Sequence, residues 1–259
     1  MNLINNKYKI IEKLGAGCFG EIYKGENIRT QEKVAIKVEP ITNNFKLLKN
    51  ESVIYQYLTG TTGIPNVKWF GKDDVNYYMV INLLGDSLQT TLNTKKSFSL
   101  KLVLQIGLQI IFTLKSIHDK DLVHRDIKPD NFLLGNNDSN KKQIYIIDFG
   151  FCKSVTNMKK TTGLIGSLTY ASLNAHNYTE LSYRDDLESL GYMLIYFYQG
   201  FLEWQPISDV ALIIQMKQQV VDNEKIPNVL REFLKQVRRL DFKERPDYNS
   251  LINLFKREI

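Results

Sequence analysis

Residues 124–131 read His-Arg-Asp-Ile-Lys-Pro-Asp-Asn, and residues 144–150 read Ile-Tyr-Ile-Ile-Asp-Phe-Gly. Asp148 lies 22 positions after Asp126, at the end of an apolar stretch with the composition of a strand. The two segments therefore supply a carboxylate, a lysine, an amide and a second carboxylate in a fixed order. Phosphoryl transfer requires a base-like carboxylate, a cation for the phosphate oxygens and oxygen ligands for Mg²⁺. The side chains of these two segments meet those requirements, so the pattern indicates phosphoryl transfer.

The chemistry of each side chain predicts its role. Asp126 would accept or orient the proton of an attacking hydroxyl, and Lys128 would stabilise charge on the transferred phosphoryl group. Asn131 and Asp148 offer oxygen ligands for magnesium. These four residues are our candidates for the catalytic and metal-binding groups.

A glycine-rich segment, Gly-Ala-Gly-Cys-Phe-Gly-Glu-Ile, occupies residues 15–22 between two predicted strands. Glycines let backbone amides approach phosphates closely, but the same spacing before a helix would indicate dinucleotide binding. A strand follows here, which favours a loop over the phosphates of ATP. The residues expected to contact the nucleotide are Leu14, Gly15, Ala16, Gly17, Cys18, Phe19, Gly20, Ile22, Ala35, Lys37, Asn82, Leu84 and Leu134.

The strand Val-Ala-Ile-Lys, residues 34–37, is apolar until it ends in a lysine. An isolated surface lysine is the simpler interpretation. A lysine that binds the α- and β-phosphates, however, needs a carboxylate to hold its flexible stem, and a predicted helix over 45–58 supplies Glu51. The sequence therefore predicts an ion pair between Lys37 and Glu51, both of which we assign to the catalytic machinery.

The predicted elements divide the chain into a strand-rich first part and a helical second part. Strands are predicted over 8–14, 21–26, 33–39, 67–71 and 77–81, with the helix 45–58 among them. Helices are predicted over 100–120, 186–201, 208–221, 228–240 and 248–259, and a polar turn over 135–143 between two strands. This pattern predicts the α+β class, with a small sheet of five strands and one helix followed by a larger helical part.

Composition excludes several other classes of protein. The net charge of +6 comes from 34 basic and 28 acidic residues, and no basic block is longer than two residues, so we expect no dedicated nucleic-acid surface. Cys18 and Cys152 lack disulfide or metal-ligand spacing, and we expect buried, inert thiols. No apolar run approaches the ~18 residues of a membrane span. We expect a soluble, monomeric protein of the cytoplasm or nucleus.

Taken together, the motifs resemble those of eukaryotic-type protein kinases from the glycine segment to the last helices. The resemblance implies a bilobal kinase fold within one domain over residues 1–259. The smaller lobe, at 1–81, would hold a five-stranded antiparallel sheet with one helix. A hinge at 82–85 would lead to the larger, mainly helical lobe at 86–259. It implies ATP and Mg²⁺ as cofactors. It also implies that Asp186 holds the catalytic loop and that His124 and Phe149 pack in the core.

A finer resemblance concerns the region after the second motif. Lysine two residues after Asp126 is typical of serine/threonine kinases. The usual Ala-Pro-Glu is missing, and the stretches Tyr-Ala-Ser-Leu-Asn-Ala-His at 170–176 and Arg-Asp-Asp-Leu-Glu at 184–188 are similar to the casein kinase 1 family. Vaccinia-related and tau-tubulin kinases share the second stretch. The resemblance implies protein substrates with serine or threonine acceptors, including acidic ones.

Two departures from the casein kinase 1 pattern affect substrate choice. Thr169 stands where the family usually has an arginine able to hold phosphate, and Gln215 stands where it has a lysine. We therefore expect a reduced preference for substrates that are already phosphorylated, although Lys217 and lysines 153, 159 and 160 are nearby candidates for the same task. The resemblance also implies activity without phosphorylation, because no second basic residue is placed to help Arg125 bind a phosphate.

A pseudokinase that binds nucleotide or a partner and regulates without catalysis is the main alternative. Such proteins commonly lose the phosphate-binding lysine, the catalytic aspartate or the magnesium aspartate. Lys37, Asp126 and Asp148 are all present here. The sequence therefore favours an active enzyme.

Overall fold

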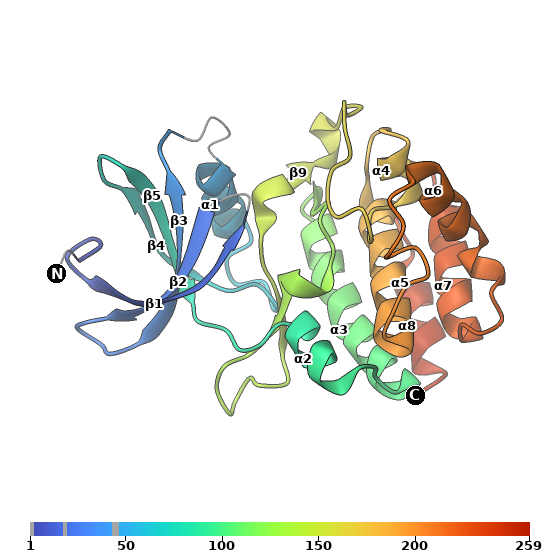
Figure 1. Cartoon of the computed structure of the whole chain (residues 1–259), viewed down its shortest axis with the longest axis horizontal. Helices are drawn as coiled ribbons and strands as arrows, with labels where there is room; N and C mark the ends of the chain where they lie inside the picture. The colour runs from blue at the N-terminus through green and yellow to red at the C-terminus, as the bar shows by residue number, and fades with distance from the viewer. Residues whose placement is uncertain (1–2, 18–19, 43–46) are drawn as a thin grey trace. The chain divides into compact units, whose positions relative to one another are not determined.

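The computed structural model describes residues 3–17, 20–42 and 47–259. The chain forms two compact units. The first unit comprises Met1–Gly85 and Leu133–Gly150, and the second comprises Asp86–Phe132 and Phe151–Ile259. Figure 1 traces both units by residue number.

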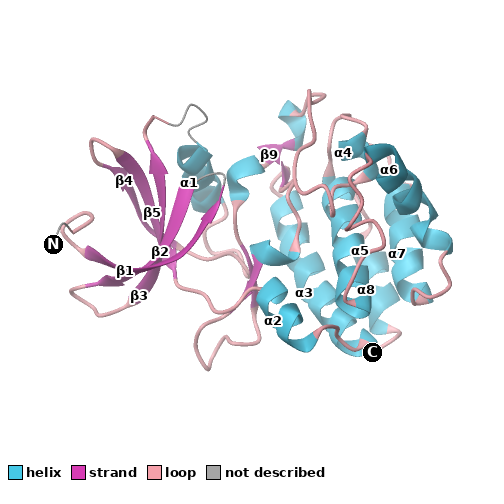
Figure 2. Ribbon diagram, viewed as in Figure 1, coloured by secondary structure: helices cyan, strands magenta, loops and turns pink. Residues whose placement is uncertain are grey.

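An antiparallel sheet forms the body of the first unit. Its strands are β1 (Tyr8–Gly17), β2 (Gly20–Asn27), β3 (Lys33–Pro40), β4 (Val67–Lys72) and β5 (Asn76–Asn82), in the order β1-β2-β3-β5-β4. Helix α1 (Leu47–Tyr57) packs on β3, β4 and β5. The five predicted strands and the helix among them are confirmed, and Figure 2 shows them by type.

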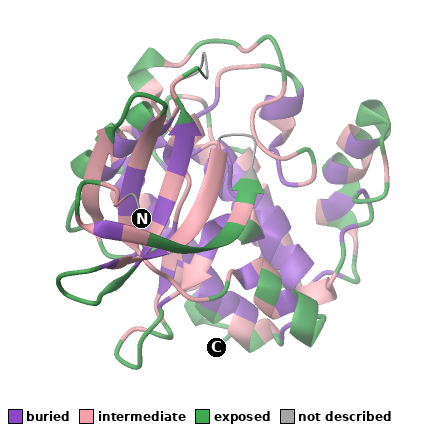
Figure 3. Ribbon diagram, turned by 60° about the vertical axis from the view of Figure 1, so that its left-hand side comes forward, coloured by how far each residue is buried: buried purple, intermediate pink, exposed green. Residues whose placement is uncertain are grey.

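Buried residues alternate with more exposed ones along most of β3. Figure 3 colours the chain by burial. On β3, Val34, Ile36 and Val38 are buried and form a core cluster with Val80 of β5 and Tyr8 of β1. Successive side chains of a strand point to opposite faces. The alternation therefore leaves Lys37 and Glu39 on the other face of β3, which is where α1 contributes its own side chains.

The hairpin of β1 and β2 carries the glycine-rich segment. Gly17 pairs with Gly20 across the strands, while Cys18 and Phe19 lie outside the described residues. Gly20 has φ +132°, and a Cβ at this position would lie 2.0 Å from the Val38 carbonyl oxygen. Only glycine satisfies both conditions. A strand, not a helix, follows the segment, as the sequence predicts for a phosphate-covering loop.

Helices make up most of the second unit. They are α2 (Leu88–Lys95), α3 (Leu100–His118), α4 (Leu173–His176), α5 (Tyr183–Gln199), α6 (Val210–Gln219), α7 (Asn228–Arg238) and α8 (Tyr248–Lys256). Helix α5 is buried almost all round and contacts α3 and α7. It begins three residues earlier than predicted, because the Asp185 carboxylate accepts a hydrogen bond from the Ser182 amide and caps the first turn.

Short strands complete the fold. β6 (Leu122–Val123) pairs with β9 (Lys153–Ser154), and β7 (Phe132–Leu134) pairs with β8 (Ile144–Ile146). The polar stretch 135–143 joins β7 to β8, as predicted. The sequence did not predict α2, whose polar residues include several poor helix formers.

Helix α3 is, among the described helices, the one long and apolar enough to cross a membrane by length and composition alone. Half of its most apolar window is buried within the protein, and it contacts α5 and α8. A core helix of a soluble protein can be equally long and apolar, so the length and composition of α3 are weak evidence for a membrane span.

Candidate active site

Three predicted residues meet in the first unit. Lys37 extends from β3, and its Nζ lies 2.6 Å from Glu51 Oε2 of α1 and 2.9 Å from Asp148 Oδ1. The predicted ion pair of Lys37 with Glu51 is confirmed. The sequence assigned Asp148 to magnesium alone and did not predict its contact with Lys37.

The charge on Lys37 is stabilised by these neighbours. Burial by itself would lower the pKa of the ammonium group, but the carboxylates of Glu51 and Asp148 outweigh burial and raise the pKa. Lys37 therefore stays positively charged at any physiological pH. A fixed cation of this kind suits an anionic group such as a phosphate.

Glu39 is a positioning residue that the sequence analysis missed. It is fully buried, and its two carboxylate oxygens accept hydrogen bonds from the first amides of α1, Leu47 N at 3.2 Å and Leu48 N at 2.9 Å. A carboxylate at a helix N-terminus satisfies unpaired amides and complements the helix dipole. Glu39 thus fixes the helix that carries Glu51 to the strand that carries Lys37. The sequence signal that could have identified Glu39 is its position two residues after Lys37, which places both side chains on the same face of β3.

The other predicted nucleotide contacts in the first unit are distributed over its strands and loops. Gly15 pairs with Ile22, and a Cβ on Gly15 would meet no described atom within 4 Å, so its backbone is open to a ligand. Asn82 uses its Oδ1 to accept from the Asn66 amide at 2.9 Å. Leu14 is half exposed, Cys18 and Phe19 are outside the described residues, and Ala16, Gly17, Gly20, Ala35, Leu84 and Leu134 lie in the same unit.

The remaining predicted residues meet in the second unit. Lys128 Nζ lies 2.6 Å from Asp126 Oδ2, and Asn131 Nδ2 donates to the Asp126 carbonyl oxygen at 2.8 Å and to Oδ2 at 3.2 Å. The Asp126 side chain is almost fully buried. Among the described residues, its second oxygen, Oδ1, has no hydrogen-bond partner. A buried acceptor of this kind is costly unless a ligand donor completes it.

Asp186 of α5 fixes the backbone of this loop. Its carboxylate accepts from His124 N at 2.7 Å, from Arg125 N at 2.8 Å and from His118 Nε2 at 3.0 Å. Burial would raise the pKa of Asp186, but the hydrogen bond and charge of His118 outweigh burial and lower the pKa. The predicted structural role of Asp186 is confirmed.

The packing roles predicted for two motif residues are also confirmed. His124 is fully buried, and Phe149 packs edge-on against Tyr55 of α1 with ring centroids 4.9 Å apart.

Arg125 and Asp148 have left-handed backbones, with φ of 69° and 68°. Such conformations cost roughly 1–3 kcal/mol and persist where the surroundings enforce them, commonly at functional sites.

The donors available for a metal are oxygen atoms. Among the described residues, no group of three or more His, Cys, Asp or Glu side chains is arranged to hold a metal ion. Mg²⁺ usually takes only one or two protein oxygens, with water and substrate phosphates completing its shell. The Asn131 amide of the second unit and the Asp148 carboxylate of the first unit each offer an oxygen of the type that Mg²⁺ prefers.

A thiol, Cys152, and a guanidinium, Arg125, lie near the second motif. Burial raises the pKa of Cys152, so the thiol is inert, as predicted. Arg125 Nε donates to the Phe151 carbonyl oxygen at 2.6 Å. This arginine is therefore engaged by a neutral backbone group.

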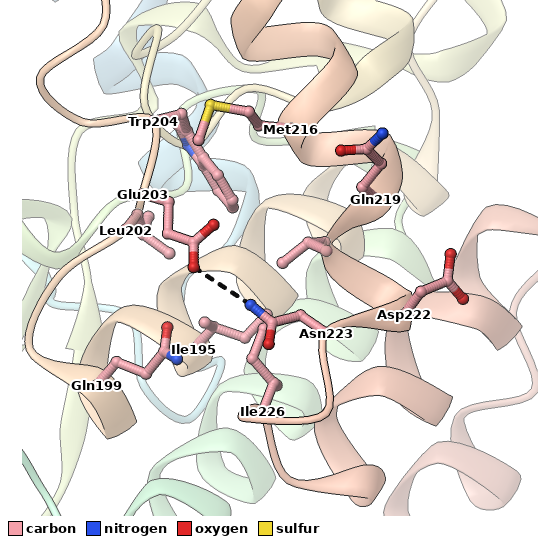
Figure 4. A pocket seen from close by; sticks show the side chains of 11 residues that line it. Ile195, Gln199, Leu202, Glu203, Trp204, Met216, Gln219, Asp222, Asn223 and Ile226 are labelled. Atoms are coloured by element: carbon pink, nitrogen blue, oxygen red, sulfur yellow. Dashed lines mark hydrogen bonds between the residues drawn. The ribbon is translucent and has the colours of Figure 1, made fainter.

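The second unit contains a cavity of about 420 Å³ (Figure 4). It is bordered by α5, α6, the loop between them and the segment after α6, and none of its lining residues is a predicted site residue. Glu203 and Asn223 share a hydrogen bond of 3.3 Å across it. The cavity contains no pairing of a base with a cation, so we do not assign the chemistry to it.

Replacing Glu39 with glutamine tests its hold on α1. Glutamine has one carbonyl oxygen in place of the two carboxylate oxygens, so one of the two backbone N–H groups of α1 loses its acceptor. We therefore expect Glu39→Gln to lower the free energy of unfolding by ~1–3 kcal/mol. Hydrogen exchange at Leu47 and Leu48 should accelerate more than exchange in the second unit. Glu32→Gln, at an exposed ion pair with Lys68, is the matched control. Unchanged exchange at the start of α1 would contradict the role given to Glu39.

The family model of the protein kinase domain matches residues 8–254 of the chain. The matched region begins with the first residue of β1 and ends within α8. It therefore contains both groups of residues described above and most of both compact units.

Proposed function

Because the chain belongs to the protein kinase family, we propose that it transfers the γ-phosphoryl group of Mg-ATP to serine and threonine hydroxyls of proteins. The observation that carries this proposal is the buried Asp126 Oδ1, which has no partner among the described residues, beside Lys128 at 2.6 Å from Oδ2. An acceptor hydroxyl would donate to that oxygen. The adjacent ammonium group would face the phosphoryl oxygens.

Each residue then has one task. Asp126 accepts or orients the hydroxyl proton, and Lys128 stabilises charge on the group in transfer. Lys37, held by Glu51, binds the α- and β-phosphates. Asn131 and Asp148 would hold magnesium, which when bound neutralises charge on the phosphates. The glycine segment covers the nucleotide with backbone amides.

The preference for serine and threonine rests on the residues of the catalytic loop. Lys128, two positions after Asp126, is the arrangement that resembles serine/threonine kinases, and the loop lacks the Leu-Ala-Ala-Arg-Asn of tyrosine kinases. The resemblance at 170–176 and 184–188 supports a casein kinase 1-like enzyme, with vaccinia-related or tau-tubulin kinases as neighbouring groups.

We further infer that primed substrates are not strongly preferred. Thr169 and Gln215 lack the charge that would bind a phosphate, and Lys217 is fully buried against backbone carbonyls. Lys217 is therefore unable to replace the missing arginine, contrary to one expectation from the sequence. We expect acidic, unphosphorylated peptide segments to be accepted, with lysines 153, 159 and 160 as the nearby positive charges.

Replacing Asp126 with asparagine tests the proposed chemistry. General-base catalysis contributes ~10²–10⁴-fold, so we expect Asp126→Asn to lower kcat by that amount with ATP binding retained. The measurement is phosphate transfer from Mg-ATP to serine, threonine and tyrosine peptides, with and without a phosphate three residues before the acceptor. Asp130→Asn, an exposed carboxylate of the same loop, is the control and should change kcat little.

Three outcomes would contradict the proposal in different ways. Binding of ATP without transfer to any peptide or to the protein itself would favour a pseudokinase. Transfer mainly to tyrosine would exclude the serine/threonine assignment. A strong preference for the phosphorylated peptides would exclude the inference about priming.

Activity should not require phosphorylation of the segment that follows Asp148. Arg125, the basic residue best placed to receive a phosphate there, already donates to the Phe151 carbonyl oxygen. We expect phosphatase treatment of the purified protein to leave kcat within about twofold, because no phosphate-dependent ion pair is lost. Mass spectrometry should verify that phosphate has been removed. Loss of activity after that treatment would show a required phosphosite.

A further inference from the structure

Lys217 of α6 is an ammonium group buried entirely within the second unit. Its Nζ lies 3.0 Å from the Leu168 carbonyl oxygen, 2.7 Å from the Ala171 carbonyl oxygen and 3.0 Å from His176 Nε2. An ammonium group has three N–H donors, and these three acceptors use all of them. No ion pair of the described residues includes Lys217. A buried lysine without a carboxylate partner is rare and calls for a reason.

Two aromatic rings complete the surroundings of this charge. The ring of Tyr192 lies 4.9 Å from Lys217 Nζ, and that of Trp204 lies 5.7 Å away. Trp204 Nε1 also donates to the Thr169 carbonyl oxygen at 2.8 Å. The backbone carbonyls of Leu168, Thr169 and Ala171 are therefore all held by side chains from α6 and the loop before it. We call residues 166–172 the acceptor segment.

The acceptor segment lies directly against the loop that carries Asp126. Gly166 has φ +87°, and a Cβ there would come within 2.6 Å of the Arg125 carbonyl oxygen and 3.5 Å of Asp126 Oδ1. The segment thus contacts the catalytic loop beside the carboxylate oxygen that lacks a partner. Side chains that hold residues 168–171 therefore also hold the backbone next to Asp126 Oδ1, the oxygen that an acceptor hydroxyl would reach.

We propose that Lys217 is a positioning residue for the protein substrate: its buried ammonium sets the backbone of the acceptor segment, so that peptide binding depends on it and nucleotide binding does not. This inference rests on the proposed function. In this role Lys217 acts on the peptide only through the backbone of the acceptor segment. The sequence had suggested a different role, direct contact with a phosphate of the substrate.

The groups around Lys217 control its charge. Glu188 and Tyr192 lie on α5, Arg238 on α7 and His176 on α4. The Glu188 carboxylate accepts from Tyr192 and from Arg238, so it attracts Lys217 only from a distance. Burial is the main cause that lowers the pKa of Lys217 to about 7, with Glu188 opposing it and Arg238 adding to it.

His176 responds to the same surroundings. Burial and the charge of Lys217 lower the pKa of His176 to about 4, so its ring is neutral and accepts from the ammonium at neutral pH. Above pH 7 Lys217 becomes a neutral amine with two donors, and its bonds to the carbonyls lose their charge assistance. Charge-assisted hydrogen bonds are roughly twice as strong as neutral ones. The hold on the acceptor segment therefore weakens as pH rises through 7.

Steady-state kinetics of Lys217→Met test the proposal. Methionine fills a similar volume but leaves the two carbonyls without donors, so we expect the peptide KM to rise about tenfold or more, because bonds from charged groups are among the strongest. The ATP KM should stay within twofold. Lys225→Met removes an exposed lysine of the same unit and should change neither constant. Equal changes in both KM values, or none, would overturn the proposal.

The pH dependence of the wild-type protein gives a second test that does not need the variant to fold. With a peptide that has no group titrating near neutrality, we expect the peptide KM to rise about fivefold from pH 6 to pH 8.5, because the charge assistance is lost. The peptide KM of Lys217→Met should be flat. A flat wild-type profile in an active enzyme overturns the inference alone, whereas absence of any transfer by the wild type overturns the proposed function and this inference with it.

Discussion

The Asp186 carboxylate is the constraint on which the catalytic half of the second unit depends. It lies inside α5, which is the most buried helix, and it accepts two backbone amides of the loop that contains Asp126. His118 of α3 donates to it, and Tyr248 of α8 bonds to the other nitrogen of that ring. Three helices and the loop thus meet at one ion. A buried charge is tolerated only when such a network satisfies it.

Other buried charges of the protein follow the same principle but serve different elements. Glu39 ties α1 to β3, Lys37 joins two carboxylates, and Lys217 gathers three acceptors around the acceptor segment. Each of these groups holds a piece of backbone or a partner that carries chemistry. These buried charges thus each fix a helix, a segment or a partner side chain, whereas apolar side chains form most of the core.

The sequence predicted the fold well because its signals were strong and local. Short strand segments separated by turns, the stripe on α3 and the apolar α5 predicted nearly every major element. Motif spacing predicted the ion pair of Lys37 with Glu51. It could not predict that Lys37 would contact Asp148, nor the left-handed backbones of Arg125 and Asp148, because these depend on tertiary packing. Glu39 and Lys217 were missed or misjudged for the same reason: burial of a charge is not visible in its neighbours along the chain.

The most direct test of this account is the kcat of Asp186→Asn, measured with saturating Mg-ATP and peptide. The amide keeps the size of the side chain but can accept only part of the hydrogen bonds that hold the loop. We expect kcat to fall about tenfold or more while the ATP KM stays within threefold, since a small misplacement of a catalytic group can cost ~10²-fold. An unchanged kcat would show that the loop is held by other means and would contradict the central role of Asp186.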